Sequence, residues 1–412
     1  MKADCRPTLL RGSEREDRVA ELKFIKPGLQ ERSSACCGPA QSALQSPDEV
    51  PSNTCLPVRG KERSAWVTGT FMTDAGAISI VSTDLTMSDY WEHVKCRTSA
   101  FRNNYTVNPG LYAVGAPDKN SDVLVSANYK LSFDALRKAL KGLNAWILVL
   151  NTEGINVWCA AGKGTFGTDE LVRSISITKL DRIVDHRRII VPQLGAPGIS
   201  AHKAKKAAGF KVCYGPVRAD DIGAYIAAGY EATREMRTVT FPLIDRLILA
   251  PMEINPAMKK HYPLYALIML AIFGLQPGGI FFKDALEGGL PFLLLGLISV
   301  SAGALFTPVL LPFIPFRSFA IKGWIIGILS VFLSTKLIAM LGHLDTVLLI
   351  FTYLFFPLAS SYIALQFTGA TTFTGISGVK KELKISIPLY ILGIVVSLIL
   401  LLFYKLGEWR LI

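Results

Sequence analysis

The stretch A-W-I-L-V-L-N at residues 145–151 decides the fold, because its first six residues are all apolar. A continuous apolar run of this length is typical of a strand that is buried on both faces. A strand with one face in water would instead alternate apolar and polar residues. The run therefore predicts an α/β domain in which helices cover both faces of a sheet.

Short apolar runs and helical patterns alternate around this strand. We expect further strands at 77–82, 123–127, 188–192 and 210–214, and helices at 131–143, 168–179 and 220–228. Thr168 is the expected N-cap of its helix, with Asp169 and Glu170 in the first turn. This alternation predicts a mostly parallel, Rossmann-like sheet. In such sheets ligands bind beyond the carboxyl ends of the strands.

Composition divides the chain of 412 residues into three parts. Residues 1–60 are rich in Ser, Pro, Arg and Glu, and we expect a disordered extension. Residues 61–255 have the charge density of a soluble domain, whereas residues 256–412 consist of long apolar runs and predict an all-α membrane domain. The net charge of +12 fits cytoplasmic loops of a membrane protein. No nucleic-acid recognition module is visible, so nucleic acid is not an expected partner.

The membrane domain is expected to cross the bilayer five times, in contact with membrane lipid. The spans lie at about 263–282, 290–312, 319–341, 346–367 and 386–406. Lys and Arg gather before the first span and in the second and fourth connections. This bias predicts a multi-pass protein of the inner (cytoplasmic) membrane, with its soluble domain in the cytoplasm and its C-terminus outside. Lys336, near His343, either reaches the membrane interface or serves ion transport, and the interface is favoured.

The cysteine pattern argues against a cluster or disulfide framework. The seven cysteines are irregularly spaced and include no C-x-x-C pair: Cys5, Cys36, Cys37, Cys55, Cys96, Cys159 and Cys213. The adjacent pair at 36–37 would suit a soft metal, although incidental thiols in a tail are favoured. Attention therefore falls on the cysteine that follows the central strand.

Cys159 lies in the stretch G-I-N-V-W-C-A-A-G-K-G-T-F-G at 154–167, which admits three interpretations. The first is a phosphate loop, because Gly162, Gly164 and Gly167 spell G-x-G-x-x-G. However, ten residues separate Asn151 from the first glycine, and the lysine before Gly164 is not followed by Ser or Thr. The second interpretation is a small core residue beside Trp and Ala.

The third interpretation is a metal ligand on a short helix over 157–161. Ala160 and Ala161 are small enough to let a flat macrocycle approach, and Gly162 would end the helix. Thiolate is a strongly electron-donating ligand for a metal cofactor. All three interpretations remain open on residue chemistry alone.

The octapeptide N-V-W-C-A-A-G-K at 156–163 closely resembles the signature of the corrinoid proteins of mercury methylation. The resemblance covers roughly residues 64–410, with further matching stretches at 108–117, 123–134, 164–171, 186–200, 212–222 and 367–374. The soluble part is also similar to the corrinoid domain of the corrinoid iron–sulfur protein large subunit of acetyl-CoA synthesis. That protein carries a cluster domain for which this chain has no cysteine set.

The resemblance implies a cobalamin-type corrinoid in its base-off form, with Cys159 as the lower axial cobalt ligand and catalytic residue. The rest of the motif would form the surrounding cap helix: Asn156, Val157, Trp158, Ala160, Ala161, Gly162 and Lys163. Strand-end positions add further candidates for cofactor contact: Ser126, Asn128, Gly195, Ala196, Gly198, Tyr214, Gly215 and Pro216. At Ser126 the family commonly has Thr, so the hydroxyl is kept and a methyl group is lost.

The implied activity is a corrinoid-dependent methyltransferase that converts Hg(II) to methylmercury. The implied partners are a two-cluster ferredoxin, as reductant and Hg(II) donor, and a methyl-folate or methyl-pterin methyltransferase as methyl source. One alternative is a membrane-anchored corrinoid methyl carrier of one-carbon metabolism, coupled to ion transport. Another is a nucleotide-binding membrane regulator, which would bind nucleotide and no cobalt.

Overall fold

The computed structural model describes residues 65–98, 100–337, 344–370 and 376–411. The predicted extension at 1–60 lies outside these ranges, as do its four cysteines and His343. The chain forms two compact units that divide between Val239 and Thr240, except that Arg97–Ser99 group with the second. The boundary predicted from sequence, at 255/256, falls inside helix α9 (Leu243–Pro256).

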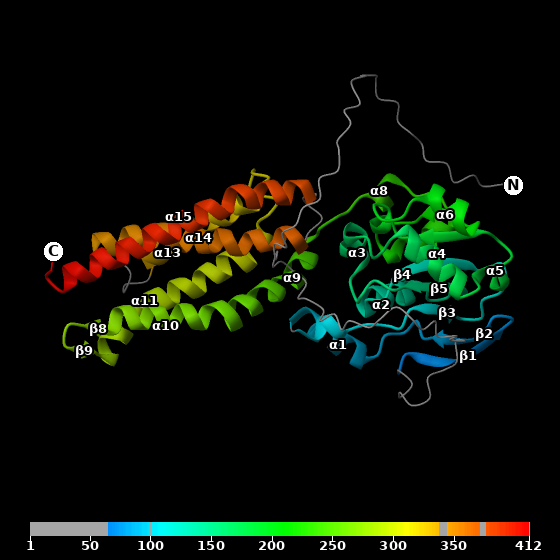
Figure 1. Ribbon diagram of the computed structural model, residues 1–412, viewed down its shortest axis with the longest axis horizontal. Coiled ribbons are helices and arrows are strands. Elements are labelled where there is room, and N and C mark those ends of the chain that lie inside the picture. The colour runs from blue at the N-terminus through cyan, green and yellow to red at the C-terminus, as the bar shows by residue number, and fades with distance from the viewer. Residues whose placement is uncertain (1–64, 99, 338–343, 371–375, 412) are drawn as a thin grey trace, which may run out of the picture. The chain divides into compact units, whose positions relative to one another are not determined.

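The first unit is built on a sheet of seven strands in the order β1-β2-β3-β5-β4-β6-β7 (Figure 1). The strands are β1 (Val67–Thr73), β2 (Gly76–Val81), β3 (Gly110–Val114), β4 (Asp122–Ala127), β5 (Ala145–Leu150), β6 (Arg188–Val191) and β7 (Lys211–Tyr214). Four neighbouring pairs are parallel, and only β1–β2 and β3–β5 are antiparallel. The prediction of a mostly parallel sheet is therefore confirmed.

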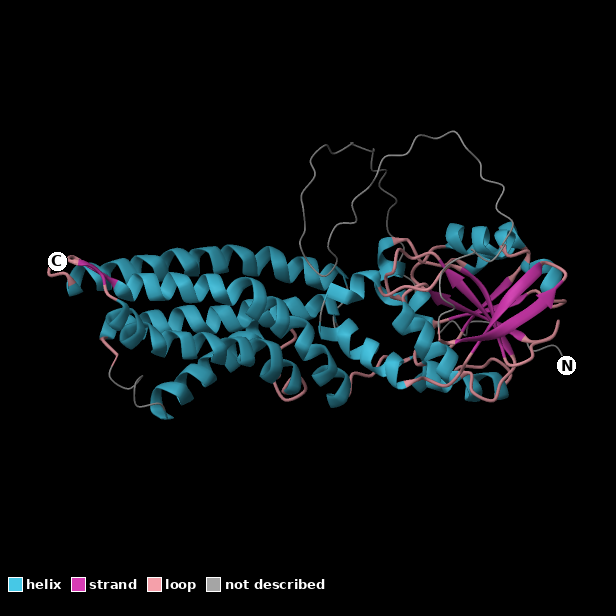
Figure 2. Cartoon of the chain, turned by 90° about the horizontal axis from the view of Figure 1, so that it is seen from below, coloured by secondary structure: helices cyan, strands magenta, loops and turns pink. Residues whose placement is uncertain are grey.

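Helices cover both faces of this sheet (Figure 2). In chain order they are α1 (Met87–Thr98), η1 (Ala100–Asn104), α2 (Lys130–Ala139), α3 (Val157–Lys163), α4 (Thr168–Ile177), α5 (Leu180–Ile183), η2 (Gln193–Gly195), α6 (Ala201–Ala208), η3 (Ala219–Asp221), α7 (Ile222–Ala227) and α8 (Arg234–Arg237). All six residues of β5 are buried, as the apolar run requires.

Two apolar clusters fill the two faces. Val125 and Leu148 pack with residues of α3, α4 and α6, whereas Leu124 and Ile147 pack with residues of α2 and α7. Successive strand residues point to opposite faces, so β4 and β5 contribute to both clusters. The strands at the centre of the sheet thus carry the core of the unit.

Three predicted helix ends were wrong. Helix α2 ends at Ala139 instead of 143. Gly167, not Thr168, is the N-cap of α4, because the Thr168 hydroxyl accepts a hydrogen bond from Ser200 N at 2.9 Å, outside its own helix. Helix α3 ends at Lys163 instead of Gly162, and Gly164 follows with a φ of +89°. That left-handed conformation costs glycine little and closes the helix.

The second unit is almost entirely helical (Figure 1). Its elements are α9, η4 (Ala257–His261), α10 (Tyr262–Gly274), β8 (Leu275–Gln276), β9 (Gly279–Ile280), α11 (Phe282–Ser301), η5 (Ala302–Phe306), α12 (Thr307–Val309), α13 (Phe319–Leu337), α14 (Thr346–Ala370) and α15 (Ile376–Glu408). Four helical stretches are long and apolar enough to cross a membrane: Phe282–Val309, Phe319–Leu337, Thr346–Thr368 and Gly378–Glu408.

The first predicted span, 263–282, is not among these four stretches. Helix α10 has 13 residues, and the chain then turns through the β8–β9 hairpin, where Pro277 and Gly278 interrupt the apolar run. The second span begins at Phe282 instead of 290, and the fifth helix begins at Ile376 instead of 386. Much of the loop expected at 368–385 is therefore helical. Lys336 is exposed at the end of α13.

Candidate functional site

The site lies at the carboxyl ends of β4 and β6, two neighbouring parallel strands. The chain leaves β4 through α2, on one face of the sheet, and leaves β6 through α6, on the other. Such a reversal opens a crevice beyond the strand ends, where ligands bind in open α/β sheets. The loop from β5 to α3 begins at the same edge of the sheet, because β5 runs parallel to β4.

Asn128, directly after β4, holds that loop in place. Its Oδ1 accepts hydrogen bonds from Thr152 N at 3.1 Å, Thr152 Oγ1 at 2.8 Å and Gly154 N at 2.9 Å. Thr152 is fully buried, and its hydroxyl also lies 2.7 Å from the Ile155 carbonyl oxygen. One side-chain oxygen therefore fixes the backbone that leads into α3.

Helix α3 carries the cysteine in its first turn. Asn156 caps the helix, since its Oδ1 accepts a hydrogen bond from Cys159 N at 2.9 Å. Val157, Trp158 and Cys159 are half-buried, and Gly162 and Lys163 are exposed. Ala160 and Ala161 are buried in the apolar core. The two alanines of the motif thus pack the helix against the core, and the cysteine lies at the edge of this packing.

The glycines of the β6–α6 loop allow close packing on the segment that follows α3. A Cβ on Gly195 would lie 2.4 Å from Phe166 Cε1, and one on Gly198 would lie 2.1 Å from Phe166 O. The same Cβ on Gly198 would lie 3.1 Å from Ala161 Cα. These glycines therefore hold α3 against the neighbouring loop.

The β6 and β7 ends are tied together. Tyr214 OH donates to Ile199 O at 2.6 Å, Gly215 N donates to Val191 O at 2.8 Å, and Gln193 N donates to Pro216 O at 3.3 Å.

Ser126 is buried, and its hydroxyl oxygen lies 3.2 Å from the Ala127 carbonyl oxygen. Since it alternates with Val125 and Ala127, its side chain is directed to the α2 face.

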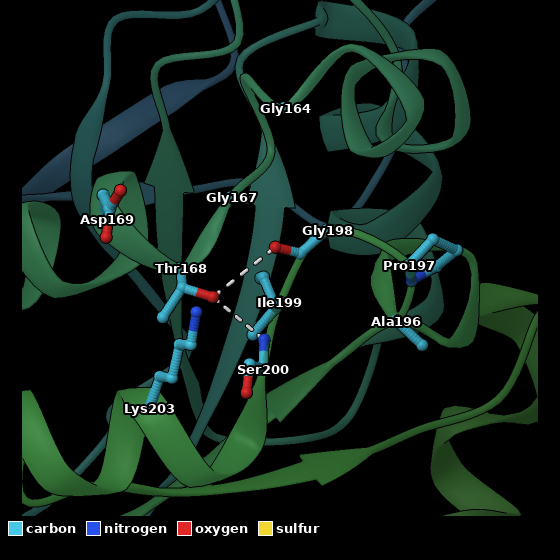
Figure 3. Close-up of a pocket in the computed structure, with 10 residues that line it drawn as sticks. All are labelled: Gly164, Gly167, Thr168, Asp169, Ala196, Pro197, Gly198, Ile199, Ser200 and Lys203. Carbon is cyan, nitrogen blue, oxygen red and sulfur yellow. Dashed lines mark hydrogen bonds between the residues drawn. The ribbon is translucent and has the colours of Figure 1, made fainter. Parts of the chain in front are cut away.

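A pocket of about 380 Å³ opens beside these loops (Figure 3). Its lining includes Gly164, Thr168, Ala196, Gly198, Ser200 and Lys203. The Thr168 hydroxyl contacts Gly198 O at 3.5 Å and Ser200 N at 2.9 Å, and Lys203 extends from α6 toward the start of α4 (Figure 3). The pocket combines two helix starts with one cation, Lys203, and one carboxylate, Asp169, an arrangement that suits a polar group.

A buried charged cluster lies under the same edge of the sheet. Asp134 is fully buried and binds Lys130 Nζ at 2.7 Å, Arg137 Nε at 2.6 Å and His93 Nε2 at 2.9 Å. Asp89 of α1 binds Lys130 Nζ at 3.1 Å and lies 3.0 Å from an Arg137 guanidinium nitrogen. The cluster joins α1 to α2, directly after Asn128.

Sequence reasoning identified the candidate stretches but missed residues that position them. Thr152, Phe166 and Thr168 each hold one loop against another. The role of Thr152 could have been predicted, because a Thr that follows a buried strand and precedes an expected helix often forms a hydrogen bond with nearby backbone groups. Phe166 carried none, because an aromatic residue in a glycine-rich loop does not reveal its packing partner.

The arrangement can offer a metal one half-buried sulfur. Within the described residues, no group of three or more His, Cys, Asp or Glu side chains is placed to hold a metal ion. A metal bound at Cys159 would therefore take its remaining ligands from another molecule, such as a macrocycle or a partner protein.

Comparison with known proteins places the similarity in this unit. Residues 92–226 match the family described as CO dehydrogenase/acetyl-CoA synthase delta subunit. Acetyl-CoA decarbonylase/synthase complex subunit gamma of Archaeoglobus fulgidus is 31% identical over 145 residues, which are 33% of this chain and 30% of that protein. The subunit gamma of Methanothermobacter thermautotrophicus is 28% identical over 196 residues, 46% of this chain and 40% of that protein.

The corrinoid/iron-sulfur protein large subunit of Moorella thermoacetica is 28% identical over 150 residues, 34% of this chain and 33% of that protein. The chain thus spans between 30% and 40% of the length of these three curated relatives. The match of the family model includes the second half of α1 and all of β4, Asn128, α3 and the β6 and β7 end loops.

Proposed function

We propose that this chain is a membrane-anchored corrinoid methyltransferase that binds its cofactor through Cys159 and transfers a methyl group to Hg(II). The similarity to a corrinoid/iron-sulfur protein supports the cofactor class. The observation that carries the site is the half-buried cysteine in the first turn of α3, at the carboxyl edge of the sheet. The mercury substrate rests on the N-V-W-C-A-A-G-K motif at 156–163.

The residues around Cys159 fit a flat macrocycle. Ala160 and Ala161 anchor the helix in the core, while the half-buried cysteine lies at the edge of this packing. The adjoining pocket, with Thr168, Ser200 and Lys203, would hold a polar part of the same cofactor. Asn128 and Asn156 would act indirectly: Asn128 holds the loop before α3, and Asn156 holds the first turn of α3.

When bound, a corrinoid supplies a cobalt centre that accepts a methyl group and gives it up to an acceptor. Cys159 would hold this centre through its thiolate. Hg(II) is an electrophile, so it must receive the methyl group together with the bonding electrons. A thiolate donates more electron density than histidine or water, and Cys159 would thereby favour this direction of transfer.

We further propose five membrane crossings, with α10 as the first. Helices α9, η4 and α10 continue without a break from Leu243 to Gly274, and Lys259 and Lys260 lie at the start of the apolar part. This topology puts the first unit in the cytoplasm and the C-terminus outside. A two-cluster ferredoxin would then deliver electrons and Hg(II), and a methyl-folate or methyl-pterin methyltransferase would deliver the methyl group.

The test is cobalt content, visible spectrum and methylmercury formation of the full-length chain, purified without oxygen and assayed with its reductant. We expect about one cobalt per wild-type chain. Cys159→Ala should lose the thiolate-to-cobalt absorption and at least about 100-fold in methylation rate, an estimate based on losses caused by changes around metal ligands. Cys213→Ala removes a buried thiol from β7 and should leave the spectrum and the rate unchanged.

Two outcomes would contradict the proposal at different levels. A folded wild-type chain that takes up no cobalt from added corrinoid would exclude the cofactor. A thiolate-ligated corrinoid chain that methylates a one-carbon acceptor but not Hg(II) would instead favour the methyl carrier of one-carbon metabolism. Dependence of that transfer on an ion gradient would support its coupling to transport.

A further inference from the structure

A second pocket lies entirely within the helical unit, between η4–α10, α11 and α14. Its volume is about 170 Å³. The lining is dominated by five aromatic rings, those of Tyr262, Tyr265, Phe355, Phe356 and Tyr362. This pocket shares no residue with the one beside α3.

The aromatic walls are held in place by hydrogen bonds and stacking. Tyr265 OH donates to Phe292 O at 2.6 Å, and Tyr262 OH donates to Leu293 O at 2.9 Å. The rings of Tyr265 and Phe355 are nearly parallel, with centroids 6.0 Å apart and an interplanar angle of 13°. Because both phenol groups are anchored on α11, the rings form a pre-organised apolar surface.

The backbone around the pocket departs from regular α-helix. η4, a π-helical turn, contributes Ala257 and His261 to the lining, and η5, a second π-helical turn, begins two residues after Val300. π-Helical turns inside α-helices are frequent at functional sites, since they widen the helix locally. Both departures in this unit thus lie at or next to the pocket.

Ser299 supplies a buried hydroxyl group to the lining. The exposed fraction of this residue is 3%, and its hydroxyl is a hydrogen-bond donor in a lining that is otherwise mainly apolar and aromatic. A carbonyl oxygen of a bound molecule would satisfy it.

We propose that this pocket binds the head group of a lipid-soluble quinone. The lining contains no carboxylate, Lys or Arg, and its one imidazole belongs to the exposed residue His261, so a charged group would find no buried counter-charge there. A flat uncharged ring suits the aromatic walls, and one of its carbonyl oxygens would accept a hydrogen bond from Ser299. This inference is independent of the corrinoid site.

The test is titration of the full-length chain, in lipid nanodiscs and without corrinoid, with decylubiquinone, followed by calorimetry. We expect saturable binding of about one quinone per chain. Ser299→Ala should weaken the affinity about fivefold to tenfold, the effect of one lost hydrogen bond. Ala359→Leu, which adds bulk to the lining, should weaken it at least about tenfold by filling the pocket.

Ser301→Ala is the matched control, because Ser301 lies on the same helix, outside the lining, and donates to Leu297 O at 3.0 Å. It should bind quinone like the wild type. Non-saturable uptake, equal affinities in all four proteins, or equal competition by palmitate would overturn the proposal. Retention of the wild-type unfolding temperature by Ser299→Ala shows that its weaker binding is not a folding defect.

Discussion

Asn128 shows how much of the site depends on a single side-chain oxygen. Replacement by Ala removes the acceptor for Thr152 N, Thr152 Oγ1 and Gly154 N. The Thr152 hydroxyl keeps the Ile155 carbonyl oxygen as its acceptor, so two backbone donors lose their partner, at about 1–3 kcal/mol each. We therefore expect Asn128→Ala to lower the free energy of unfolding by about 2–6 kcal/mol and to reduce cobalt occupancy after reconstitution with corrinoid.

Asn144→Ala is the control for this change. Asn144 is exposed and its Oδ1 accepts one hydrogen bond, from Ala116 N at 3.0 Å. It should leave cobalt occupancy unchanged. Denaturant unfolding and cobalt analysis of both variants decide the point, and equal behaviour of the two would contradict a positioning role for Asn128.

Residue chemistry also sets the limit of what the sequence could predict about the site. The small residues at 160 and 161 suggested room for a macrocycle, yet both are buried in the core. Gly195 and Gly198 suggested close approach of a ligand, yet Phe166 fills the space where their side chains would be. Small residues report close approach, but a sequence does not say whether a ligand or the protein itself approaches.

At the scale of elements, α1 and α2 are joined by buried ion pairs that respond to acid. Burial alone would raise the pKa of Asp89, but the Thr86 backbone N–H and the Lys130 ammonium group lower it to about 2 from 3.8. A carboxylate whose pKa is lowered on folding stabilises the folded state above its unfolded pKa. This contribution should be lost as the pH falls from about 4 to about 2.

The variant Asp134→Asn tests this joint directly. It removes one of the two carboxylates that compensate Lys130 and Arg137, so we expect a loss of about 3–5 kcal/mol in unfolding free energy at neutral pH. Asp84→Asn breaks only an exposed ion pair, with Lys141 at 2.7 Å, and should have no measurable effect. Denaturant titrations at pH 7 compare the two. A loss for Asp134→Asn no larger than for Asp84→Asn would show that the buried pairs do not hold α1 on α2.

Element prediction succeeded where burial dictated the pattern. The expected strands at 77–82, 123–127, 145–151, 188–192 and 210–214 each match an observed strand to within one residue at either end, because all are apolar runs in the sheet. Strand β1 was missed, since it is an edge strand whose residues alternate between half-buried and exposed. Strand β3 was missed as well, although its last three residues are buried. Helix α1 was missed because its outer face carries Met87, Tyr90, Trp91 and Val94, all exposed, which blurs the amphipathic pattern.

At the scale of the whole molecule, the number of crossings determines the side on which the chain ends. Four crossings would return the C-terminus to the side of the first unit, whereas five place it opposite. The sequence contains no cysteine after Cys213, so Leu411→Cys introduces a reporter at an exposed position. We expect a membrane-impermeant maleimide to label Leu411→Cys in intact cells, and the unchanged chain to remain unlabelled. Labelling only after the cells are opened would support four crossings.

Two buried cationic side chains bind carbonyl groups at one helix end of the second unit. Arg246 Nη1 donates to Val309 O at 2.7 Å, and Lys322 Nζ donates to Leu311 O at 2.6 Å. Val309 is the last residue of α12 and Leu311 lies two residues beyond it, so both cations bind carbonyl groups at the carboxyl end of this helix, where a positive charge is favourable. The sequence indicated the Lys and Arg residues around the second connection, Lys322 among them, only as charges that set the orientation, because hydropathy does not reveal which carbonyl oxygens a lysine satisfies.

The hydrogen bonds of Asn128 have a consequence for the biogenesis of the protein. They link the loop before α3 to β4, and Ala160 and Ala161 pack that helix into the apolar core. Groups of the polypeptide itself thus hold the cysteine helix, whereas the ligand loops of some domains fold only around a metal. Under the proposed function, the chain should be able to complete synthesis and membrane insertion first and to acquire the corrinoid later, so corrinoid supply would limit the active fraction without limiting the amount of folded protein.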